Sequence, residues 1–526
     1  MRGKEQIAVR IGFWAVILFS VFAWAPTTYP GYWEAIEGFR PVFNAVHPTA
    51  IAGVATQADL WRGSGSATYL IAQPLMLFGM SPTAAVRATF AVAFILGGLG
   101  MYVWLRERWG DRGAGLAGML FMLWPPLLAT VYVRGSLSDA LLLGLMPLAF
   151  AGIAINSKYH NPSSLAIIAI SVFWIWRTQA GLAGVATVLL LAYAFVVERS
   201  WLTLLVVLFS AAAGLTSLIP FWSIRAESPV AFFDQFIYPQ QLLYGTWTVA
   251  PSVAGWQDKY PFLLGVATVG FGIVALWLWV TQRGALRGTR AHSLLAFSSV
   301  GALLLILVSL PVTSPMWQIS HADRLFTYPW QPLLLAGPLL AVIASSLVVT
   351  STDLAKPVLW TVLLALVVLG SLPYLTAEFT QIEAPESPRA VFGLGPDIVL
   401  LGANVNEDED RQQARLAVTW QTAQPLPFDY NVFFQALRDT PDGVEVVAQL
   451  DAQPLQGERP ATSWIPGEIF TDTYTLDLSA DSALPAGGQD VRGTDLRYYF
   501  GYYDWRDGSR LPVDGGIDDK LVLHGE

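Results

Sequence analysis

The stretch that decides the fold is residues 179–197, QAGLAGVATVLLLAYAFVV, which contains no charged residue. Arg177 precedes it, and Glu198 and Arg199 follow it. A helix needs about 20 apolar residues to cross the hydrocarbon core of a bilayer, which is roughly 30 Å thick. This stretch therefore predicts a membrane-spanning helix between two charged connections.

Similar apolar runs recur along the first 375 residues, between short breaks that are charged or rich in Pro and Gly. They predict eleven spans, near residues 11–26, 83–105, 113–132, 136–155, 163–176, 179–197, 201–220, 260–281, 294–311, 330–349 and 357–375. Arg2, Lys4 and Arg10 precede the first run as in a signal peptide, but no small-residue cleavage site follows. We therefore expect the first run to be a retained anchor.

The composition also fits a membrane protein. The 526 residues are 54% hydrophobic and only 13% charged, with 21 Trp and 28 Phe, which is more apolar surface than one soluble core buries. The absence of cysteine from the sequence excludes disulfides, thiolate metal sites and Cys nucleophiles. The five His are too scattered in the sequence to favour a His-based metal site.

The charges are distributed unevenly along the chain. Residues 1–375 contain 20 Lys and Arg against 13 Asp and Glu, a net +7, whereas residues 376–526 contain 10 against 26, a net −16. With the N-terminus in the cytoplasm, each short cytoplasmic connection carries a positive charge, as the positive-inside rule expects: residues 106–112, Lys158, 198–199, 283–290 and Lys356. Eleven spans then place the C-terminal part outside, together with the long connections 27–82, 221–259 and 312–329.

From residue 376 onward the pattern changes to period-two alternation, which is typical of half-buried strands. The alternating sets are Leu416, Val418 and Trp420; Val432, Phe434 and Ala436; Tyr474, Leu476 and Leu478; and Leu496, Tyr498, Phe500 and Tyr502. Pro441-Asp442-Gly443 is a turn between two such runs. We expect a linker over 376–395 and an all-β sandwich over 396–526. Its acidic charge disfavours nucleic acid as a partner.

Short motifs occur in a fixed order in the predicted membrane part. They are Leu60-Trp61-Arg62-Gly63-Ser64-Gly65, Gln73-Pro74-Leu75, Phe78-Gly79-Met80-Ser81, Tyr132-Val133-Arg134-Gly135-Ser136-Leu137-Ser138-Asp139, Tyr244-Gly245, Gly255-Trp256-Gln257-Asp258-Lys259, Pro261-Phe262-Leu263-Leu264-Gly265 and Tyr328-Pro329-Trp330-Gln331. Their order resembles the GT-C superfamily of polytopic membrane glycosyltransferases, and within it a large group of bacterial membrane proteins. The sequence departs from the family pattern at Asp139, which replaces Glu, and at Gln331, which replaces Arg.

The tail resembles a domain that is often appended to such enzymes. Its marks include Asp429-Tyr430-Asn431-Val432-Phe433, Thr462-Ser463-Trp464, Pro466-Gly467-Glu468 and Gly501-Tyr502-Tyr503-Asp504. Together the two resemblances imply a GT-C-like polytopic helical domain with a C-terminal β-sandwich, in the plasma membrane of a bacterium. They imply transfer of a sugar from a polyprenyl-phosphate donor to a glycan, lipid or protein acceptor on the outer face.

The resemblance also implies the kinds of groups at the site. The family's base is an acidic residue in the first external loop, usually Asp, where this chain offers Glu37, a third departure from the family pattern, then Glu34 and Asp59. The sequence is equally consistent with a structural interpretation. In it, Glu34 and Glu37 are solvated charges on a short amphipathic helix, where Glu37 offsets Arg40, and Asp59 pairs with Arg62.

Three basic side chains are candidates to hold the donor phosphate. They are Arg134, His321 and Arg324. An alternative role for Arg134 is structural, with its long side chain extending to the membrane interface. Asp139 is five residues from Arg134, off the spacings at which side chains pair along a helix. Asp323 with Glu37 or Asp59 offers oxygen ligands to a divalent cation such as Mg²⁺ or Mn²⁺, although no spacing enforces a site.

Two other functions stay open at this point. The departures from the family motifs leave room for a scaffold that kept the fold and lost the chemistry, an accessory subunit of a larger membrane complex. A transporter fits the helix count, but it would usually bury acidic residues at mid-membrane, and Asp139 and Arg177 fall near span ends.

Overall fold

The structure, a computed structural model, describes residues 10–47, 66–216, 232–250, 252–281, 289–377, 379–380, 388–393, 397–408, 412–440, 443–478, 496–514, 516–517 and 519–525. Its contacts divide the chain into two compact units. The helical unit comprises Met1–Ala35 and Ala58–Phe379, and the sheet unit comprises Ile36–Gln57 and Thr380–Glu526.

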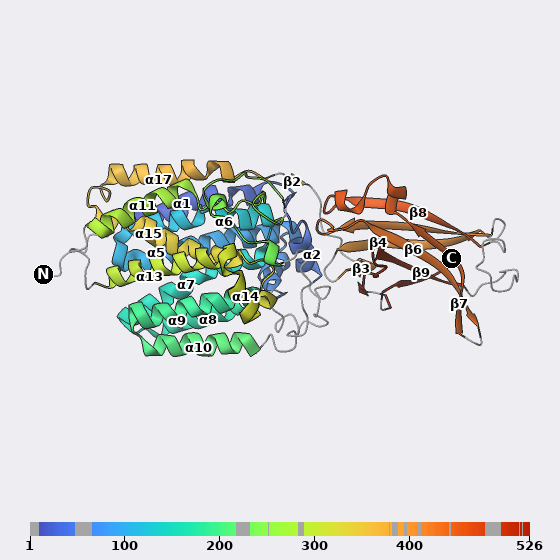
Figure 1. The fold of residues 1–526 in the computed structure, drawn as a ribbon, viewed down its shortest axis with the longest axis horizontal. Helices are drawn as coiled ribbons and strands as arrows, with labels where there is room; N and C mark the ends of the chain where they lie inside the picture. Colours follow the sequence, from blue (N-terminus) through green and yellow to red (C-terminus); the bar gives the residue numbers. More distant parts are fainter. Residues whose placement is uncertain are drawn as a thin grey trace. The chain divides into compact units, whose positions relative to one another are not determined.

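The helical unit is built of apolar helices that run side by side (Figure 1). The longer ones are α1 (Ile11–Trp24), α5 (Pro82–Met122), α7 (Leu137–Tyr159), α8 (Pro162–Thr178), α9 (Ala180–Ala192), α10 (Trp201–Thr216), α11 (Val266–Thr281), α13 (Arg290–Val308), α15 (Ala336–Ser345) and α17 (Pro357–Ser371). Shorter pieces connect or extend them: η1 (Ala25–Thr28), β1 (Tyr32–Trp33), η3 (Ser66–Ile71), α4 (Ala72–Leu77), α6 (Pro125–Ala129), η4 (Thr130–Arg134), η5 (Tyr193–Glu198), η7 (Phe232–Asp234), η8 (Pro239–Leu242), η9 (Pro311–Thr313), α14 (Ser314–Ser320), η10 (Ala322–Leu325), η11 (Gln331–Leu335), α16 (Leu347–Thr350) and η12 (Leu372–Tyr374).

Seven helical segments of the described chain are long and apolar enough to cross a membrane: Ile11–Thr28, Pro82–Met122, Leu137–Tyr159, Ala180–Glu198, Arg290–Val308, Gln331–Thr350 and Pro357–Tyr374. The spans predicted at 163–176, 201–220 and 260–281 fall on the shorter apolar helices α8, α10 and α11. The spans predicted at 83–105 and 113–132 share α5, which Gly110 interrupts with a φ of 68° that suits glycine.

Polar side chains fix where several of these helices begin. Ser81, Asn161 and Gln179 cap α5, α8 and α9 by accepting hydrogen bonds from the backbone N–H groups of Ala84, Ser163 and Leu182. Such a cap stabilises a helix by about 1 kcal/mol, since the first N–H groups have no partner within the helix.

Small residues let α5 and α7 pack closely. A Cβ added to Gly100 would lie 2.9 Å from Pro147, and one added to Gly144 would lie 2.5 Å from the carbonyl oxygen of Ala93. Larger side chains at either position would force the helices apart. This is the small-residue packing that is common between helices in membranes.

The outer helices α10, α11 and α17 expose apolar side chains. Phe209 is 72% exposed, Trp277 63% and Leu369 61%. Contiguous apolar surface of this kind is unfavourable in water and suits contact with lipid acyl chains.

The segments predicted as cytoplasmic connections meet one another at one end of the helical unit. The contacts that join them are Gly12 N to Asp111, Arg112 to the carbonyl of Ala355, Trp360 Nε1 to the carbonyl of Arg112, Lys158 to Glu107, Arg108 to Glu198, and Arg290 to Ser157. This gathering is what alternate crossing by consecutive helices requires.

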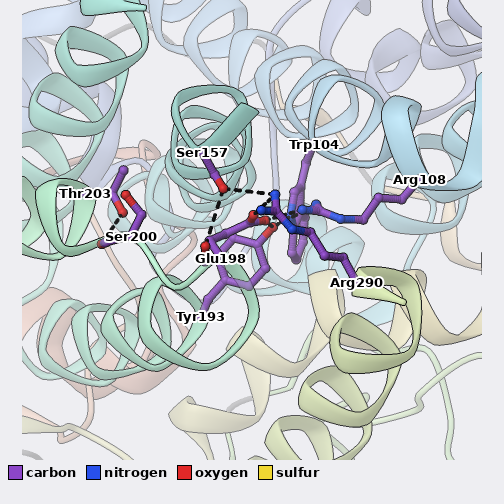
Figure 2. Close-up of polar contacts among 8 residues, drawn as sticks. All are labelled: Trp104, Arg108, Ser157, Tyr193, Glu198, Ser200, Thr203 and Arg290. Carbon is purple, nitrogen blue, oxygen red and sulfur yellow. Dashed lines mark hydrogen bonds and ion pairs between the residues drawn. The ribbon is translucent and has the colours of Figure 1, made fainter. Parts of the chain in front are cut away.

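A buried carboxylate organises this end of the helical unit. Figure 2 shows Arg108 from α5 and Arg290 from α13 directed at Glu198, the last residue of η5. The Glu198 side chain is 0% exposed; it pairs with Arg108 and lies 3.5 Å from Arg290. The Tyr193 hydroxyl donates to Glu198 and accepts from Trp104 Nε1 at 2.9 Å. One carboxylate thus links two helices to the end of a third.

The sheet unit contains two antiparallel sheets, with strand orders β10-β3-β4-β5-β8 and β11-β9-β6-β7 (Figure 1). The strands are β3 (Ala390–Phe392), β4 (Ile398–Asp408), β5 (Gln413–Thr422), β6 (Tyr430–Thr440), β7 (Gly443–Ala452), β8 (Ile469–Asp477), β9 (Leu496–Asp504), β10 (Val513–Asp514) and β11 (Leu521–His524); β2 (Phe379–Thr380) lies at the unit boundary, and η13 (Pro454–Gly457) and η14 (Ala461–Ser463) lie between β7 and β8. β6 and β7 pair through Thr440 and Gly443, next to the predicted turn, whose residues 441–442 lie outside the description.

The alternation predicted from the sequence is confirmed in the sheet core. The four alternating sets, from Leu416 to Tyr502, belong to one buried cluster that draws on both sheets. Rings from the two sheets meet within it: Phe392 lies 5.0 Å from Tyr502, and Trp420 lies 6.5 Å from it, between ring centroids. β3 lies within residues 376–395, which the sequence suggested as linker, because its three buried residues pair with β4.

A short helix from the first long connection belongs to the sheet unit. α2 (Arg40–Val46) places Phe43 in an apolar cluster with Val391, Val399 and Ala423. Arg40 donates to Gln424 at 3.3 Å. Residues 36–47 therefore pack with the sheets rather than with the helices around them in sequence.

Candidate functional site

Arg134 and Asp139 form a buried ion pair in the helical unit. Arg134 ends η4, Gly135 reverses the chain with a φ of 74°, and Asp139 lies in the first turn of α7. Their side chains are only 12% and 2% exposed. The spacing of five residues disfavours pairing along one helix, but the pair forms because the chain turns between two helices.

Aromatic side chains from the last long connection lie over this pair. The Arg134 guanidinium carbon lies 5.9 Å from the Tyr328 ring centroid and 5.7 Å from that of Trp330. Tyr328 and Tyr260 both stack on Trp330, at 5.0 and 4.9 Å. Cation–π contacts of this kind contribute about 0.5–2 kcal/mol each. Motifs that are 194 residues apart, at Arg134 and Tyr328, thus form one cluster.

Gln331, which stands where the family pattern has Arg, has a structural role. Its side-chain oxygen accepts hydrogen bonds from the backbone N–H groups of Thr327 and Tyr328, at 2.9 and 3.1 Å. The residue is 1% exposed. Gln331 therefore closes the turn that presents Tyr328 and Trp330 to Arg134.

Trp33 brings the first long connection to the same cluster. Its indole Nε1 donates to the carbonyl of Val131 at 2.9 Å, and its ring lies 5.7 Å from that of Tyr132. Glu34 follows Trp33 and is half-buried. Trp33 thus fixes the chain next to η4, the segment that ends at Arg134, and Glu34 is the next residue along the chain.

The other two predicted acidic residues have different surroundings. Glu37 belongs to the sheet unit, in the turn before α2, where the N–H of Arg40 donates to its carbonyl at 3.2 Å. Asp59 and the Gly-rich stretch after it lie outside the described residues. Glu34 thus belongs to the same unit as Arg134, whereas Glu37 belongs to the sheet unit.

His321, Asp323 and Arg324 lie together on a sharp turn. His321 follows the last residue of α14 with a φ of 52°, and η10 comes next. His321 and Arg324 are exposed, whereas Oδ1 of Asp323 is buried without a hydrogen-bond partner. η10 contacts the junction of α8 and α9, where Gln179 Nε2 donates to the carbonyl of Leu325 at 3.4 Å.

Arg177, at the end of α8, is a residue that sequence reasoning did not select. It is 8% exposed, and its Nε and Nη1 have no hydrogen-bond partner. Its guanidinium carbon lies 4.7 Å from the Phe173 ring centroid. The helix C-terminus favours a cation by about 0.3–1 kcal/mol and the ring by about 0.5–2 kcal/mol. Burial of an unpaired charge costs several kcal/mol, so these contacts do not offset it.

Asp397 of the sheet unit yields a prediction about pH. Burial raises the pKa of Asp397 to about 6, against the opposing effects of the hydrogen bond from Gln424 and the charge of Arg40. The ordinary value is 3.8, so the folded state binds this proton more tightly than the unfolded state between those values. The carboxyl therefore contributes stability at low pH that is lost as pH rises through about 6.

Asp397→Asn should consequently raise the unfolding temperature of the sheet unit near pH 7 and have little effect near pH 4. Thermal unfolding of the full chain, followed through sheet circular dichroism at several pH values, measures the difference between variant and wild type. Asp439→Asn changes a carboxylate that is 62% exposed and serves as the control. A difference that does not change with pH would contradict the assignment.

No metal centre is assembled among the described side chains. They contain no group of three or more His, Asp or Glu residues that could hold an ion. Of the ligands predicted for Mg²⁺ or Mn²⁺, Asp323 belongs to the helical unit and Glu37 to the sheet unit, and Asp59 lies outside the described residues.

Comparisons with known proteins identify no family. No protein-family model and no curated protein matches the chain. Among solved structures, ArnT from Cupriavidus metallidurans in the apo state is 16% identical, with 69% of this chain and 78% of that chain covered, at a TM-score of 0.29. Pseudomonas fluorescens alkylpurine DNA glycosylase AlkC is 10% identical, with 80% and 99% covered, at a TM-score of 0.12. Scores this low support no conclusion about fold or function, so the chain is characterised by its apolar helices and its antiparallel sheets.

Proposed function

We propose that this chain is a glycosyltransferase of the bacterial plasma membrane. It takes a sugar from a polyprenyl-phosphate donor at the outer face and adds it to a glycan, lipid or protein acceptor. The observation that carries the proposal is the cluster in which Trp33 anchors the start of the Glu34 segment and Arg134 lies between Asp139 and the Tyr328 and Trp330 rings. Arg134 and Asp139 come from one motif of the sequence resemblance and Tyr328 and Trp330 from another, and Trp33 belongs to the first long connection.

The proposed chemistry assigns one role to each kind of group. A carboxylate, Glu34 in first place and Glu37 in second, accepts the proton of the acceptor hydroxyl while its oxygen attacks the anomeric carbon. The bond from that carbon to the phosphate oxygen breaks, and polyprenyl phosphate leaves. Arg134, with Arg324 and His321 on the neighbouring turn, stabilises the negative charge of the leaving phosphate.

The proposal requires eleven crossings, with the N-terminus in the cytoplasm. The segment from Arg112 to Arg134 supports it. It consists of the end of α5, a break at Leu123–Trp124, α6 and η4, and at the helical rise its 22 steps span at most about 33 Å, close to the thickness of a bilayer core. The positively charged connections would then lie in the cytoplasm and the Arg134 cluster near the outer face.

Single cysteines test this topology cleanly, since the sequence contains none. Ser509→Cys in the sheet unit should react with a membrane-impermeant maleimide in intact cells. Ser163→Cys, in the first turn of α8, should react only after permeabilisation; both serines are exposed. Labelling of Ser163→Cys in intact cells, or protection of Ser509→Cys, would overturn the orientation.

Sugar transfer tests the function itself. The purified protein in lipid nanodiscs should release sugar from a glycosyl polyprenyl phosphate, and a panel of sugars covers the unknown specificity. Glu34→Gln should lower the rate at least about 100-fold because it removes the base, whereas Glu37→Gln should lower it less. Equal loss in both variants would assign no preference between them, and absence of turnover with every donor would reject the enzyme.

One observation favours a scaffold as the second candidate. Asp139 already neutralises Arg134, and Gln331 is committed to closing a turn. A catalytically inactive subunit of a membrane complex, with the sheet unit as its docking surface, would retain both contacts. Copurification of stoichiometric partners without donor turnover would favour this candidate.

A further inference from the structure

We propose that Arg177 binds the phosphate group of an anionic ligand. This inference rests on the proposed function for the identity of that ligand, a polyprenyl phosphate. Nothing in the sequence resemblance selects Arg177, and neither Arg134 nor Arg324 shares its surroundings.

The first reason is its unmatched hydrogen-bonding capacity. A guanidinium carries five N–H donors. In Arg177 the Nε and Nη1 atoms are shielded from solvent and have no partner, and its described contact is with the face of Phe173. Buried charges in proteins are normally paired, so the site lacks an acceptor. A phosphate offers several charged oxygens in the geometry that an arginine binds best.

The second reason is the contrast with other arginines of the helical unit. Arg134 is paired with Asp139, and Arg108 with Glu198. Arg87 donates to the carbonyl of Gly31 at 2.9 Å, and Arg324 is exposed to solvent. Arg87 also has a buried Nε without a partner, but its Nη1 is bonded; Arg177 combines burial of the whole side chain with two unmatched donors, as suits a residue that binds an anion.

The third reason is its position beside the proposed site. Gln179, two residues after Arg177, donates to the carbonyl of Leu325, two residues after Asp323. A Cβ on Gly181 would lie 2.3 Å from that same carbonyl oxygen, so α9 and η10 are in close contact. The chain continues from η10 to Tyr328 and Trp330, which lie over Arg134. One segment therefore joins the surroundings of Arg177 to the Arg134 cluster.

Binding to the full-length protein in detergent micelles tests the inference. The probes are polyprenyl phosphate, the corresponding polyprenol and inorganic phosphate. Wild type should bind polyprenyl phosphate more tightly than polyprenol, and Arg177→Gln should weaken only the phosphate-bearing lipid, by about 10- to 100-fold. Competition by inorganic phosphate would show that the site takes the phosphate group alone, and its absence would show that the lipid chain is also required; either result supports the inference.

Two further variants keep the test decisive. Arg199→Gln changes an exposed arginine among the predicted cytoplasmic connections and should bind like wild type. Arg177→Lys retains the charge without the planar fork, and should give an intermediate loss even if Arg177→Gln fails to fold. Without ligand, Arg177→Gln should not lower the unfolding temperature, because an unmatched charge is removed. A lower unfolding temperature with unchanged binding would overturn the inference in favour of a structural role.

The outcomes separate this inference from the proposed function. If wild type transfers sugar and Arg177→Gln binds polyprenyl phosphate normally, the inference fails and the function stands. If Arg177→Gln loses binding while wild type transfers no sugar, the phosphate site stands and the enzyme is rejected. Equal affinity of wild type for polyprenol and polyprenyl phosphate would overturn the inference directly.

Discussion

Glu198→Gln should destabilise the helical unit by about 3–5 kcal/mol, the usual cost of removing one partner from a buried ion pair. The glutamine retains the shape of the side chain and part of its hydrogen bonding. It removes the negative charge that Arg108 and Arg290 share, and Glu198 is 0% exposed while Arg108 is 11% exposed. Two cations then face each other without a carboxylate between them.

Denaturant or thermal unfolding in one detergent measures this loss. Glu107→Gln is the matched control, because Glu107 pairs with Lys158 in a neighbouring connection but is 44% exposed. An exposed pair of this kind contributes about 0–1 kcal/mol. If the two variants were equally stable, Glu198 would not organise this end of the helical unit.

The spacing of apolar residues predicted the helices and strands of both units, because burying an element in lipid or in a core directly determines where its apolar residues stand. An uncharged run such as residues 179–197 has one stable arrangement in a bilayer, a helix, and the structure forms helix from Ala180 to Glu198. The alternation at Leu416, Val418 and Trp420 likewise has one face to bury, and all three are at most 1% exposed. Such signals are local, so a single sequence contains them.

Neighbours that are distant along the chain could not be predicted in this way. Phe43 packs with Val391 and Val399 although about 350 residues separate them, and no local pattern specifies that residues 36–47 join the sheet unit. The surroundings of Arg177 could be predicted only in part. The sequence has no Asp or Glu between Asp139 and Glu198, so an arginine in that interval has no local acidic partner. That gap could have identified Arg177, whereas the burial of its side chain depends on how the helices pack.

Asp139→Asn should destabilise the helical unit by a similar amount, about 3–5 kcal/mol, because Arg134 loses its carboxylate at a site where both side chains are nearly inaccessible. Arg134→Gln should also be destabilising, because it leaves the buried Asp139 carboxylate without its cation. The double variant should lose less than the sum of the two single losses, since neither charge is then left behind. Unfolding of all four proteins measures the coupling between the two residues, and additive losses would contradict a direct pair.

Activity of the same four proteins separates the two proposed functions. If Arg134 stabilises the leaving phosphate, Asp139→Asn retains the cation and should retain transfer at a temperature where it is folded, whereas Arg134→Gln should not. In a scaffold the pair serves stability alone, so both single variants would lose partner binding in proportion to their loss of folded protein. The carboxylate then acts as a positioning residue for Arg134 in the first case and as its structural counter-charge in the second. Because both variants lose similar stability, a difference in transfer between them cannot come from unfolding and must report a role of the Arg134 cation itself.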